Sequence, residues 1–472
     1  MILSSLRLGE QLGEQLGEQL VDLRIQDGLI AEIGPSLGSG EDFAGRWVSP
    51  GLWDHHVHFT QWTLTSRRVD LSPAGSAREA AAIIGAAVEG TLVVGANFRD
   101  GLWPDAPSRA ALDATTGDVP VVLVSADLHS VWLNSAALAE FGHPGHPTGL
   151  LTEDDAFAVH QRLDTVADET VDGWARAAST AAAARGVVGI VDFEMAWNLE
   201  HWQRRIAAGH DALRVEFGIY TQDLERAIAE GLHTGQRMHD LLTVGRYKVL
   251  SDGSLNTRTA YTWDAYEDGT HGQLTVPPEA LVPLMRRAAE AGIVPTVHAI
   301  GDHANTLALD AFEELGIHGS IEHVQLLAEN DIPRFAALGV EASVQPEHAM
   351  DDRDVADRLW AGRTGRLYPF RSLLDAGATL LLGSDAPVSP LDPWVQIAAA
   401  VTRERDARPP WHHEQRITSA EALAASTRTT VAVGQTADLV ITDLDPLTAS
   451  GEELRGMPVA ATLLGGRFTY RA

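Results

Sequence analysis

The chain has 472 residues, a formal net charge of −30 at pH 7 and no cysteine. This length exceeds what one hydrophobic core usually organises, so we expect one large domain with a smaller one, or two domains of ordinary size. The excess of acidic residues disfavours nucleic acid and anionic membranes as partners. The lack of cysteine excludes disulfides, thiolate metal sites and cysteine nucleophiles, so a metal ion would need His, Asp, Glu or a modified Lys as its ligands.

The N-terminal residues Met1–Leu8 contain no basic start, no long apolar run and no small-residue cleavage site. No segment approaches the roughly 18 uninterrupted apolar residues that a membrane-spanning helix needs. The sequence therefore predicts a soluble cytoplasmic protein.

Four short runs with strand character lie near the two ends of the chain: Ile2–Leu8, Leu20–Ile33, Ala437–Asp443 and Ala461–Tyr470. Asp27-Gly28, inside the second run, is a strong hairpin signal. Because the two sets lie at opposite ends, we predict that residues 1–48 and 431–472 form one composite β-sandwich domain.

Residues 9–20 repeat Gly-Glu-Gln-Leu three times. Three copies of four residues are too few for a solenoid, whose repeats are much longer. We interpret the repeat as a local duplication that lengthens a surface turn, in preference to an interaction segment.

The middle of the chain alternates apolar strands with alanine-rich helices. The strand candidates are Val121–Ser125, Val187–Phe193, Arg214–Tyr220, Tyr247–Leu250, Val294–His298, Ser320–Val324, Val340–Val344 and Thr379–Gly383. Helical segments such as Pro278–Ala291, Asp302–Leu315 and Asn330–Leu338 separate several of them. This alternation indicates parallel pairing, because parallel strands need long crossovers. We predict an α/β fold, a (β/α)8 TIM-like barrel over residues 49–430, with an insertion at about residues 60–175.

The strongest local feature is the segment Pro50-Gly-Leu-Trp-Asp-His-His-Val-His58. Residues two apart in a strand project to the same side, so His56 and His58 can face one metal ion. Histidine suits zinc, iron or nickel. Taken alone, such a motif is more often a pair of surface or hydrogen-bonded histidines.

Three later segments place a further ligand candidate at the C-terminal end of an apolar strand: Val294–His298, Ser320–His323 and Leu380–Asp385. The C-terminal strand ends of a barrel form its active-site face, so His298, His323 and Asp385 would converge with His56 and His58. Each residue alone could be a satisfied core residue, but the repetition of one structural context favours a metal site.

Five longer strings add to this pattern: Asp127-Leu-His-Ser-Val-Trp-Leu-Asn-Ser135, Asp252-Gly-Ser-Leu255 with Arg258-Thr-Ala260, His298-Ala-Ile-Gly-Asp302, Gly383-Ser-Asp-Ala-Pro387 and Val433-Gly-Gln-Thr-Ala-Asp-Leu439. With them the chain resembles, nearly end to end, the amidohydrolase superfamily of metal-dependent hydrolases. More narrowly, it resembles the YtcJ-like branch, amidohydrolase family 3. The resemblance implies the barrel and the β-sandwich described above, a homodimer, and a site for one or two divalent ions. We favour zinc over iron, manganese or nickel.

Residue by residue, the resemblance implies metal ligation by His56, His58, His298, His323 and Asp385. Many members of the superfamily carry a carboxylated lysine that bridges two ions, and Lys248 falls at that position. The carboxylate of Glu153 is a competing candidate for this role, and an ordinary ion pair of Lys248 with a residue such as Asp252 is another interpretation.

The candidate substrate-binding residues are His129, Trp132, Asn134, Glu153, Arg258 and Gln345. The resemblance places residues 127–135 near the pocket, although core packing would explain Trp132 equally well. Gln345 follows the predicted strand Val340–Val344, at another strand end facing the same side of the barrel.

The sequence thus predicts a metal-dependent amidohydrolase that cleaves a C–N bond, other than a peptide bond, in an amide-like or cyclic amide small molecule. A bound divalent ion lowers the pKa of water toward ~7. Asp385 would accept the proton of that water and return it to the leaving amine. The first alternative is a deaminase, or an ester or lactone hydrolase, with the same metal site. The alternative of another class is a catalytically silent small-molecule-binding homologue, against which the complete ligand set argues.

Overall fold

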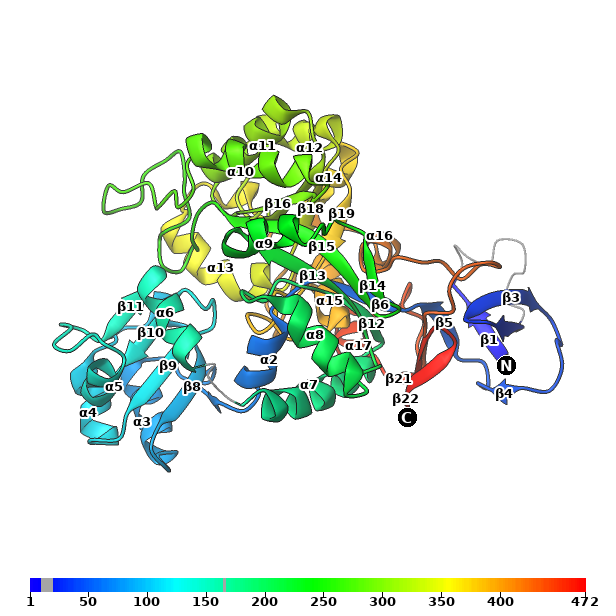
Figure 1. Ribbon diagram of the computed structural model, residues 1–472, viewed down its shortest axis with the longest axis horizontal. Helices are drawn as coiled ribbons and strands as arrows, with labels where there is room; N and C mark the ends of the chain where they lie inside the picture. The colour runs from blue at the N-terminus through cyan, green and yellow to red at the C-terminus, as the bar shows by residue number, and fades with distance from the viewer. Residues whose placement is uncertain (10–19, 164–166) are drawn as a thin grey trace.

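The computed structural model describes residues 1–9, 20–163 and 167–472. Apart from Gly9 and Leu20, the Gly-Glu-Gln-Leu repeat lies outside the described residues. Figure 1 shows three parts in a row: a small α/β unit, a central barrel, and a sheet to which both chain termini belong. The barrel lies between the other two parts.

The central part is a barrel of parallel strands. In their order around the barrel they are β6 (Leu52–Val57), β12 (Val187–Asp192), β13 (Arg214–Tyr220), β15 (Leu242–Leu250), β16 (Pro295–Ala299), β17 (Gly319–His323), β18 (Val340–Val344) and β19 (Leu380–Leu382). The short β14 (Arg237–His239) pairs antiparallel with β15. The backbone N–H of Asp385 donates to the carbonyl of His56 at 2.7 Å, and that of His58 donates to Ala386 at 2.8 Å. These bonds bring the last strand back beside the first, which confirms the predicted barrel.

Helices pack around the barrel, and most of them connect its strands (Figure 1). They are α2 (Phe59–Thr65), α7 (Asp168–Ala183), α8 (Asn198–Ala207), α9 (Leu224–Ala229), α10 (Pro278–Glu290), α11 (Asp302–Leu315), α12 (Ile332–Leu338), α13 (His348–Leu359), α14 (Phe370–Asp375), α15 (Pro393–Thr402), α16 (Ser419–Ala425) and α17 (Gly451–Arg455). Among the described residues, no helix combines the length and the apolar character needed to cross a membrane.

One predicted barrel strand belongs elsewhere. Val121–Ser125 is β9, the middle strand of a separate sheet inserted between β6 and β12, and β6, the strand that carries His56, takes its place in the barrel. The other strands of that sheet are β7 (Val69–Asp70), β8 (Val93–Phe98), β10 (Ser130–Leu133) and β11 (Leu150–Thr152), and its helices are α3 (Ala77–Ala86), α4 (Arg109–Thr116), α5 (Ser135–Glu140) and α6 (Asp154–Leu163). Because β9 is buried along its whole length, like a barrel strand, its apolar composition did not distinguish the two sheets.

The two chain ends build one mostly antiparallel sheet, as predicted. Its strands are β1 (Ile2–Leu8), β2 (Val21–Gln26), β3 (Leu29–Gly34), β4 (Glu41–Asp42), β5 (Trp47–Pro50), β20 (Leu439–Thr442), β21 (Val459–Leu464) and β22 (Arg467–Arg471). The hairpin between β2 and β3 turns at Asp27 and Gly28, whose φ angles of 52° and 78° are those of a left-handed turn. β5 pairs with β20, so the sheet joins residues nearly 400 positions apart in the sequence and leads directly into β6.

Candidate active site

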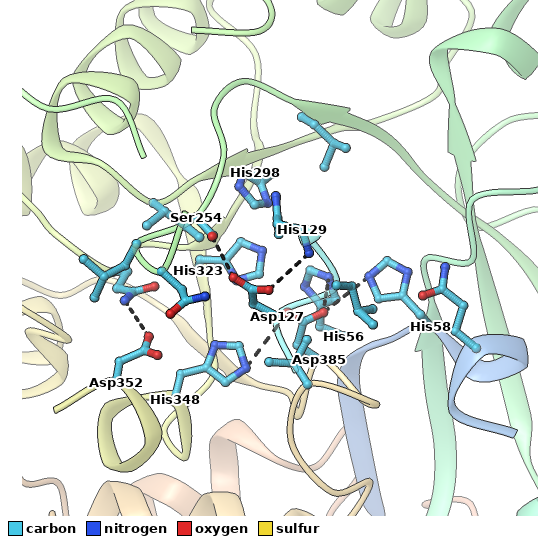
Figure 2. Close-up of a pocket in the computed structure, with 18 of the residues that line it drawn as sticks. His56, His58, Asp127, His129, Ser254, His298, His323, His348, Asp352 and Asp385 are labelled. Atoms are coloured by element: carbon cyan, nitrogen blue, oxygen red, sulfur yellow. Dashed lines mark hydrogen bonds and ion pairs between the residues drawn. The ribbon is translucent and has the colours of Figure 1, made fainter. Parts of the chain in front are cut away.

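Histidine side chains converge at the carboxyl ends of the barrel strands (Figure 2). His56 lies in β6, and His58 follows it at the start of α2. His298 and His323 lie at the ends of β16 and β17. The ring centroids of His298 and His323 are 4.4 Å apart, those of His56 and His323 5.0 Å, and those of His56 and His58 5.6 Å. Three strand ends therefore bring four imidazoles into one cluster.

Asp385, which follows β19, completes this cluster. Its Oδ1 lies 3.4 Å from Nε2 of His56 and 3.3 Å from Nε2 of His58. One nitrogen each of His56 and His323 and one oxygen of Asp385 lie within 4.8 Å of one another. Burial opposes ionisation, but the neighbouring histidines hold the pKa of Asp385 well below its usual range. The site thus combines an anionic carboxylate with converging imidazoles.

Several buried polar atoms in this region have no hydrogen-bond partner among the described residues, including Nδ1 of His323, Nδ1 of His58 and Nζ of Lys248. The ammonium of Lys248 lies 4.7 Å from the ring centre of Phe193, and burial lowers the pKa of Lys248 to about 8. Buried polar groups are normally satisfied, so an unpartnered imidazole and amine beside a carboxylate point to a partner of another kind. The residues present therefore fit a bound metal ion.

Glu322 is a functional candidate that the sequence analysis missed. Its Oε2 lies 2.7 Å from Nδ1 of His56, and its Oε1 accepts hydrogen bonds from Thr296 at 2.6 Å and Ser320 at 3.0 Å. With Nδ1 of His56 committed to this carboxylate, Nε2 is the nitrogen that faces Asp385. The signal was available, since Glu322 is a charged residue inside the otherwise uncharged run Ser320–His323.

The backbone is strained where these strands end. His323, Val324 and Asp385 have φ angles of 77°, 46° and 57°, a region that residues with a Cβ rarely adopt, least of all β-branched valine. Such conformations persist only where the surrounding structure enforces them, and they concentrate at functional sites. Their presence at the ends of β17 and β19, beside the histidine cluster, supports a site built for a purpose other than packing.

A cavity of about 90 Å³ opens above the cluster. Six of the predicted metal-site residues line it: His56, His58, Lys248, His298, His323 and Asp385. Apolar side chains such as Phe157 and Met195 form part of the wall, and His129 reaches it from the insertion. The pocket thus lies between the barrel and the inserted α/β unit.

Two predicted substrate-binding residues do not reach this pocket. The Trp132 side chain is fully buried in the core of the insertion, edge-on to Phe98 and Trp103 at centroid distances of 6.4 Å. Asn134 caps α5, where its Oδ1 accepts a hydrogen bond from the Ala137 N–H at 2.9 Å. In this structure Trp132 packs in the core of the insertion and Asn134 caps a helix, so neither side chain lines the pocket.

The other three predicted substrate-binding residues lie around the pocket without lining it. The carboxylate of Glu153 is bonded to His129 at 2.9 Å and to Thr259 at 2.7 Å. Arg258 lines a second, shallower depression, where it is half-exposed and lies 4.0 Å from Asp268. Gln345 is buried, with its Nε2 3.5 Å from Nδ1 of His56.

Comparison with known proteins shows the family of this chain. Residues 40–470 match the amidohydrolase family. The chain belongs to this family. Its relatives include the putative amidohydrolase YtcJ of Bacillus subtilis (strain 168), which is 26% identical over 90% of this chain and 89% of its own. The N-substituted formamide deformylase of Arthrobacter pascens is 27% identical over 91% of this chain and 89% of its own.

A solved amidohydrolase-like structure is similar over nearly the whole length. It is an uncharacterized metal-dependent hydrolase from Pyrococcus horikoshii OT3, with a TM-score of 0.80, 25% identity, and coverage of 96% of this chain and 99% of that one. Together these relatives confirm the predicted resemblance to the YtcJ-like members of the amidohydrolase family.

Proposed function

We propose that this amidohydrolase uses a bound divalent metal to hydrolyse the C–N bond of a small amide-like or cyclic amide substrate. The observation that carries the proposal is the convergence of nitrogens of His56 and His323 with an oxygen of Asp385, all within 4.8 Å of one another at the pocket wall. The name of the Arthrobacter pascens relative supports an N-substituted amide, such as a formamide, as the substrate class.

In this proposal the metal ligands are His56, His58, His298, His323 and Asp385, and a carboxylated Lys248 joins them if two ions bind. Nitrogen and oxygen donors of this kind suit zinc, iron or nickel, and of these we propose zinc. When bound, the ion acts as a Lewis acid and makes a water molecule acidic near neutral pH. The lowered pKa of Lys248, about 8, leaves a larger fraction of uncharged amine, which is the form that can be carboxylated.

Asp385 is the proposed proton carrier. Its low pKa keeps the carboxylate anionic, so it can accept a proton from the attacking water and return it to the leaving nitrogen. His56 and His58, at 3.4 and 3.3 Å, fix the position of this carboxylate. Phe157 and Met195 limit the access of bulk water to the reacting bond.

Metal content is the first test. Protein purified without chelator should hold at least one tightly bound divalent ion per chain by elemental analysis, and His323→Ala should lose it. Lys248→Ala should lower a ratio near two toward one if the lysine bridges two ions. His413→Ala is the matched control, because His413 is exposed and far along the chain from the cluster. A wild-type ratio below one ion per chain would contradict the proposal.

A substrate panel is the second test. We expect wild-type protein to hydrolyse one or more small N-substituted or cyclic amides, and Asp385→Asn to be inactive with its metal retained. Turnover of lactones alone, or release of ammonia from amino-heterocycles alone, would select the alternative hydrolases. A metal-loaded protein that binds panel members without converting them would instead be a binding homologue.

A further inference from the structure

Glu153 ends the turn after β11, and its carboxylate is fully engaged. Oε2 lies 2.9 Å from Nδ1 of His129, while Oε1 accepts hydrogen bonds from Thr259 at 2.7 Å and Thr257 at 3.1 Å. The two threonines belong to the barrel segment after β15, whereas His129 and Glu153 belong to the insertion. With both oxygens occupied, Glu153 is poorly suited to bridge metal ions, the role that the sequence left open for it.

Hydrogen bonds fix both the backbone and the side chain of His129. Its N–H donates to Asp127 at 3.2 Å, and its carbonyl accepts from the Glu153 N–H at 2.9 Å. The preceding Leu128 and the partner Glu153 both have positive φ angles, 63° and 50°, so the turn is strained to bring them together. The ring of Phe157 packs edge-on against the imidazole at 5.6 Å. His129 therefore has one defined ring orientation.

The second ring nitrogen of His129, Nε2, lies across the ring from the nitrogen that Glu153 holds. Nδ1 is committed to Glu153, His129 lines the cavity, and its ring centre lies 6.2 Å from that of His298 (Figure 2). Burial disfavours a charged imidazole, but a carboxylate oxygen 2.9 Å from Nδ1 favours it. The geometry therefore pairs His129 and Glu153 as imidazolium and carboxylate.

We propose that His129 donates a hydrogen bond from Nε2 to the acyl oxygen of the substrate as negative charge develops on it, and that Glu153 is the residue that positions His129. The inference rests on the proposed function and adds a catalytic group that is supplied by the insertion rather than by the barrel. A fixed, charged donor in a largely enclosed protein pocket stabilises a developing oxyanion far better than it would in bulk solvent. A hydrogen-bond donor at this position selects a neutral amide as substrate, with its carbonyl group facing the insertion.

A purely structural ion pair is the competing explanation. Glu153 does tie the insertion to the barrel through Thr257 and Thr259, and that part of the network needs no histidine. A structural role predicts effects on stability alone. A contact to the acyl oxygen in the transition state predicts a loss of kcat with little change in KM.

The kinetic test uses an amide that the wild-type enzyme hydrolyses. For His129→Gln we expect kcat to fall about 100-fold or more, with KM and metal content unchanged, as for other oxyanion donors. For Glu153→Gln we expect a smaller fall in kcat, also with full metal content. His143→Gln, a histidine of the insertion that does not line the pocket, is the matched control.

Three results would overturn the proposal. The first is an unchanged kcat in His129→Gln, and the second is a change in KM alone, which would assign His129 to binding a carboxylate of the substrate. The third is loss of metal from Glu153→Gln, which would make Glu153 a metal ligand. Two readouts do not depend on turnover. Methylphosphonate, an anionic mimic of the tetrahedral intermediate, should bind at least tenfold more weakly to His129→Gln than to wild type. The low-field NMR signal of the His129 Nδ1 proton should disappear in Glu153→Gln.

These readouts separate the two proposals. If the wild-type protein hydrolyses no amide, the proposed function fails, and phosphonate binding and the NMR signal still decide the role of His129. If amides are hydrolysed and both variants behave like wild type, only the inference about His129 fails.

Discussion

His56 and Glu322 form a buried hydrogen bond of 2.7 Å, although 266 positions separate them in the sequence. Glu322 also accepts hydrogen bonds from Thr296 and Ser320, so one carboxylate connects β6, β16 and β17. The bond commits Nδ1 of His56 and leaves Nε2 facing Asp385, 3.4 Å away. The orientation of one proposed metal ligand is thus determined by a carboxylate from another strand.

Replacing this carboxylate should weaken metal binding without removing a ligand. We expect Glu322→Gln to lower the affinity for zinc about 10- to 100-fold, the usual cost of losing a partner that orients a ligating histidine. Competition with a chromogenic chelator measures the affinity. Glu314→Gln is the control, because Glu314 is an exposed carboxylate that pairs with Arg286 on the barrel surface. Equal affinities for the two variants would show that His56 does not depend on Glu322.

A methyl group at Gly383 should open the barrel at the site. A Cβ on Gly383 would lie 2.6 Å from the backbone nitrogen of His56 and 2.8 Å from its Cβ, so β6 or β19 must move. We expect Gly383→Ala to lower the free energy of unfolding by about 1–3 kcal/mol, as overpacking does, and to reduce metal content. In Gly365→Ala, the control, the new Cβ meets nothing within 4 Å. Urea unfolding measures the free energy of unfolding. If Gly383→Ala and Gly365→Ala were both as stable as wild type, the predicted steric clash at Gly383 would be wrong.

Acid should destabilise the fold through buried histidines away from the site. Burial, with Arg205 nearby, lowers the pKa of His210 to about 4. In the unfolded chain the His210 imidazole binds a proton near pH 6.5, whereas in the folded protein it stays neutral down to about pH 4. Neutral His210 therefore costs no stability above pH 6.5, and the free energy of unfolding falls as the pH drops from 6.5 toward 4. For this group the decline approaches about 1.4 kcal/mol per pH unit.

The pH effect is measured by urea unfolding of wild type and His210→Gln between pH 7 and pH 4. We expect a shallower dependence in the variant, because the titrating group is gone, and a wild-type slope in His413→Gln. Parallel curves for wild type and His210→Gln would show that other groups cause the acid sensitivity.

Trp132 should affect stability rather than substrate binding. Because its side chain is enclosed in the insertion core, we expect Trp132→Ala to cost about 3–5 kcal/mol, as large-to-small core substitutions do. Trp132→Phe should fold and keep the wild-type KM. Thermal unfolding and steady-state kinetics check both points, with the half-exposed Trp263→Ala as control. A raised KM in Trp132→Phe at unchanged stability would restore the substrate role.

Local pattern predicted most of the fold. The bounds of Arg214–Tyr220 and Val340–Val344 agree with β13 and β18, and the hairpin at Asp27-Gly28 lies between β2 and β3. These features depend on residues close together in the sequence. Val121–Ser125 was assigned to the wrong sheet, because a buried apolar strand has the same composition whichever neighbours it pairs with.

The sequence by itself determined the chemistry that is available. Without cysteine, a metal site must use nitrogen and oxygen donors. The two-residue period of a strand put His56 and His58 on one side, and apolar runs placed His298 and His323 at strand ends. Only the tertiary structure decided which polar groups meet: Glu322 with His56, and Glu153 with His129. The physical reason is that a strand sets the direction of its own side chains, whereas their partners depend on how the barrel closes and where the insertion docks on it.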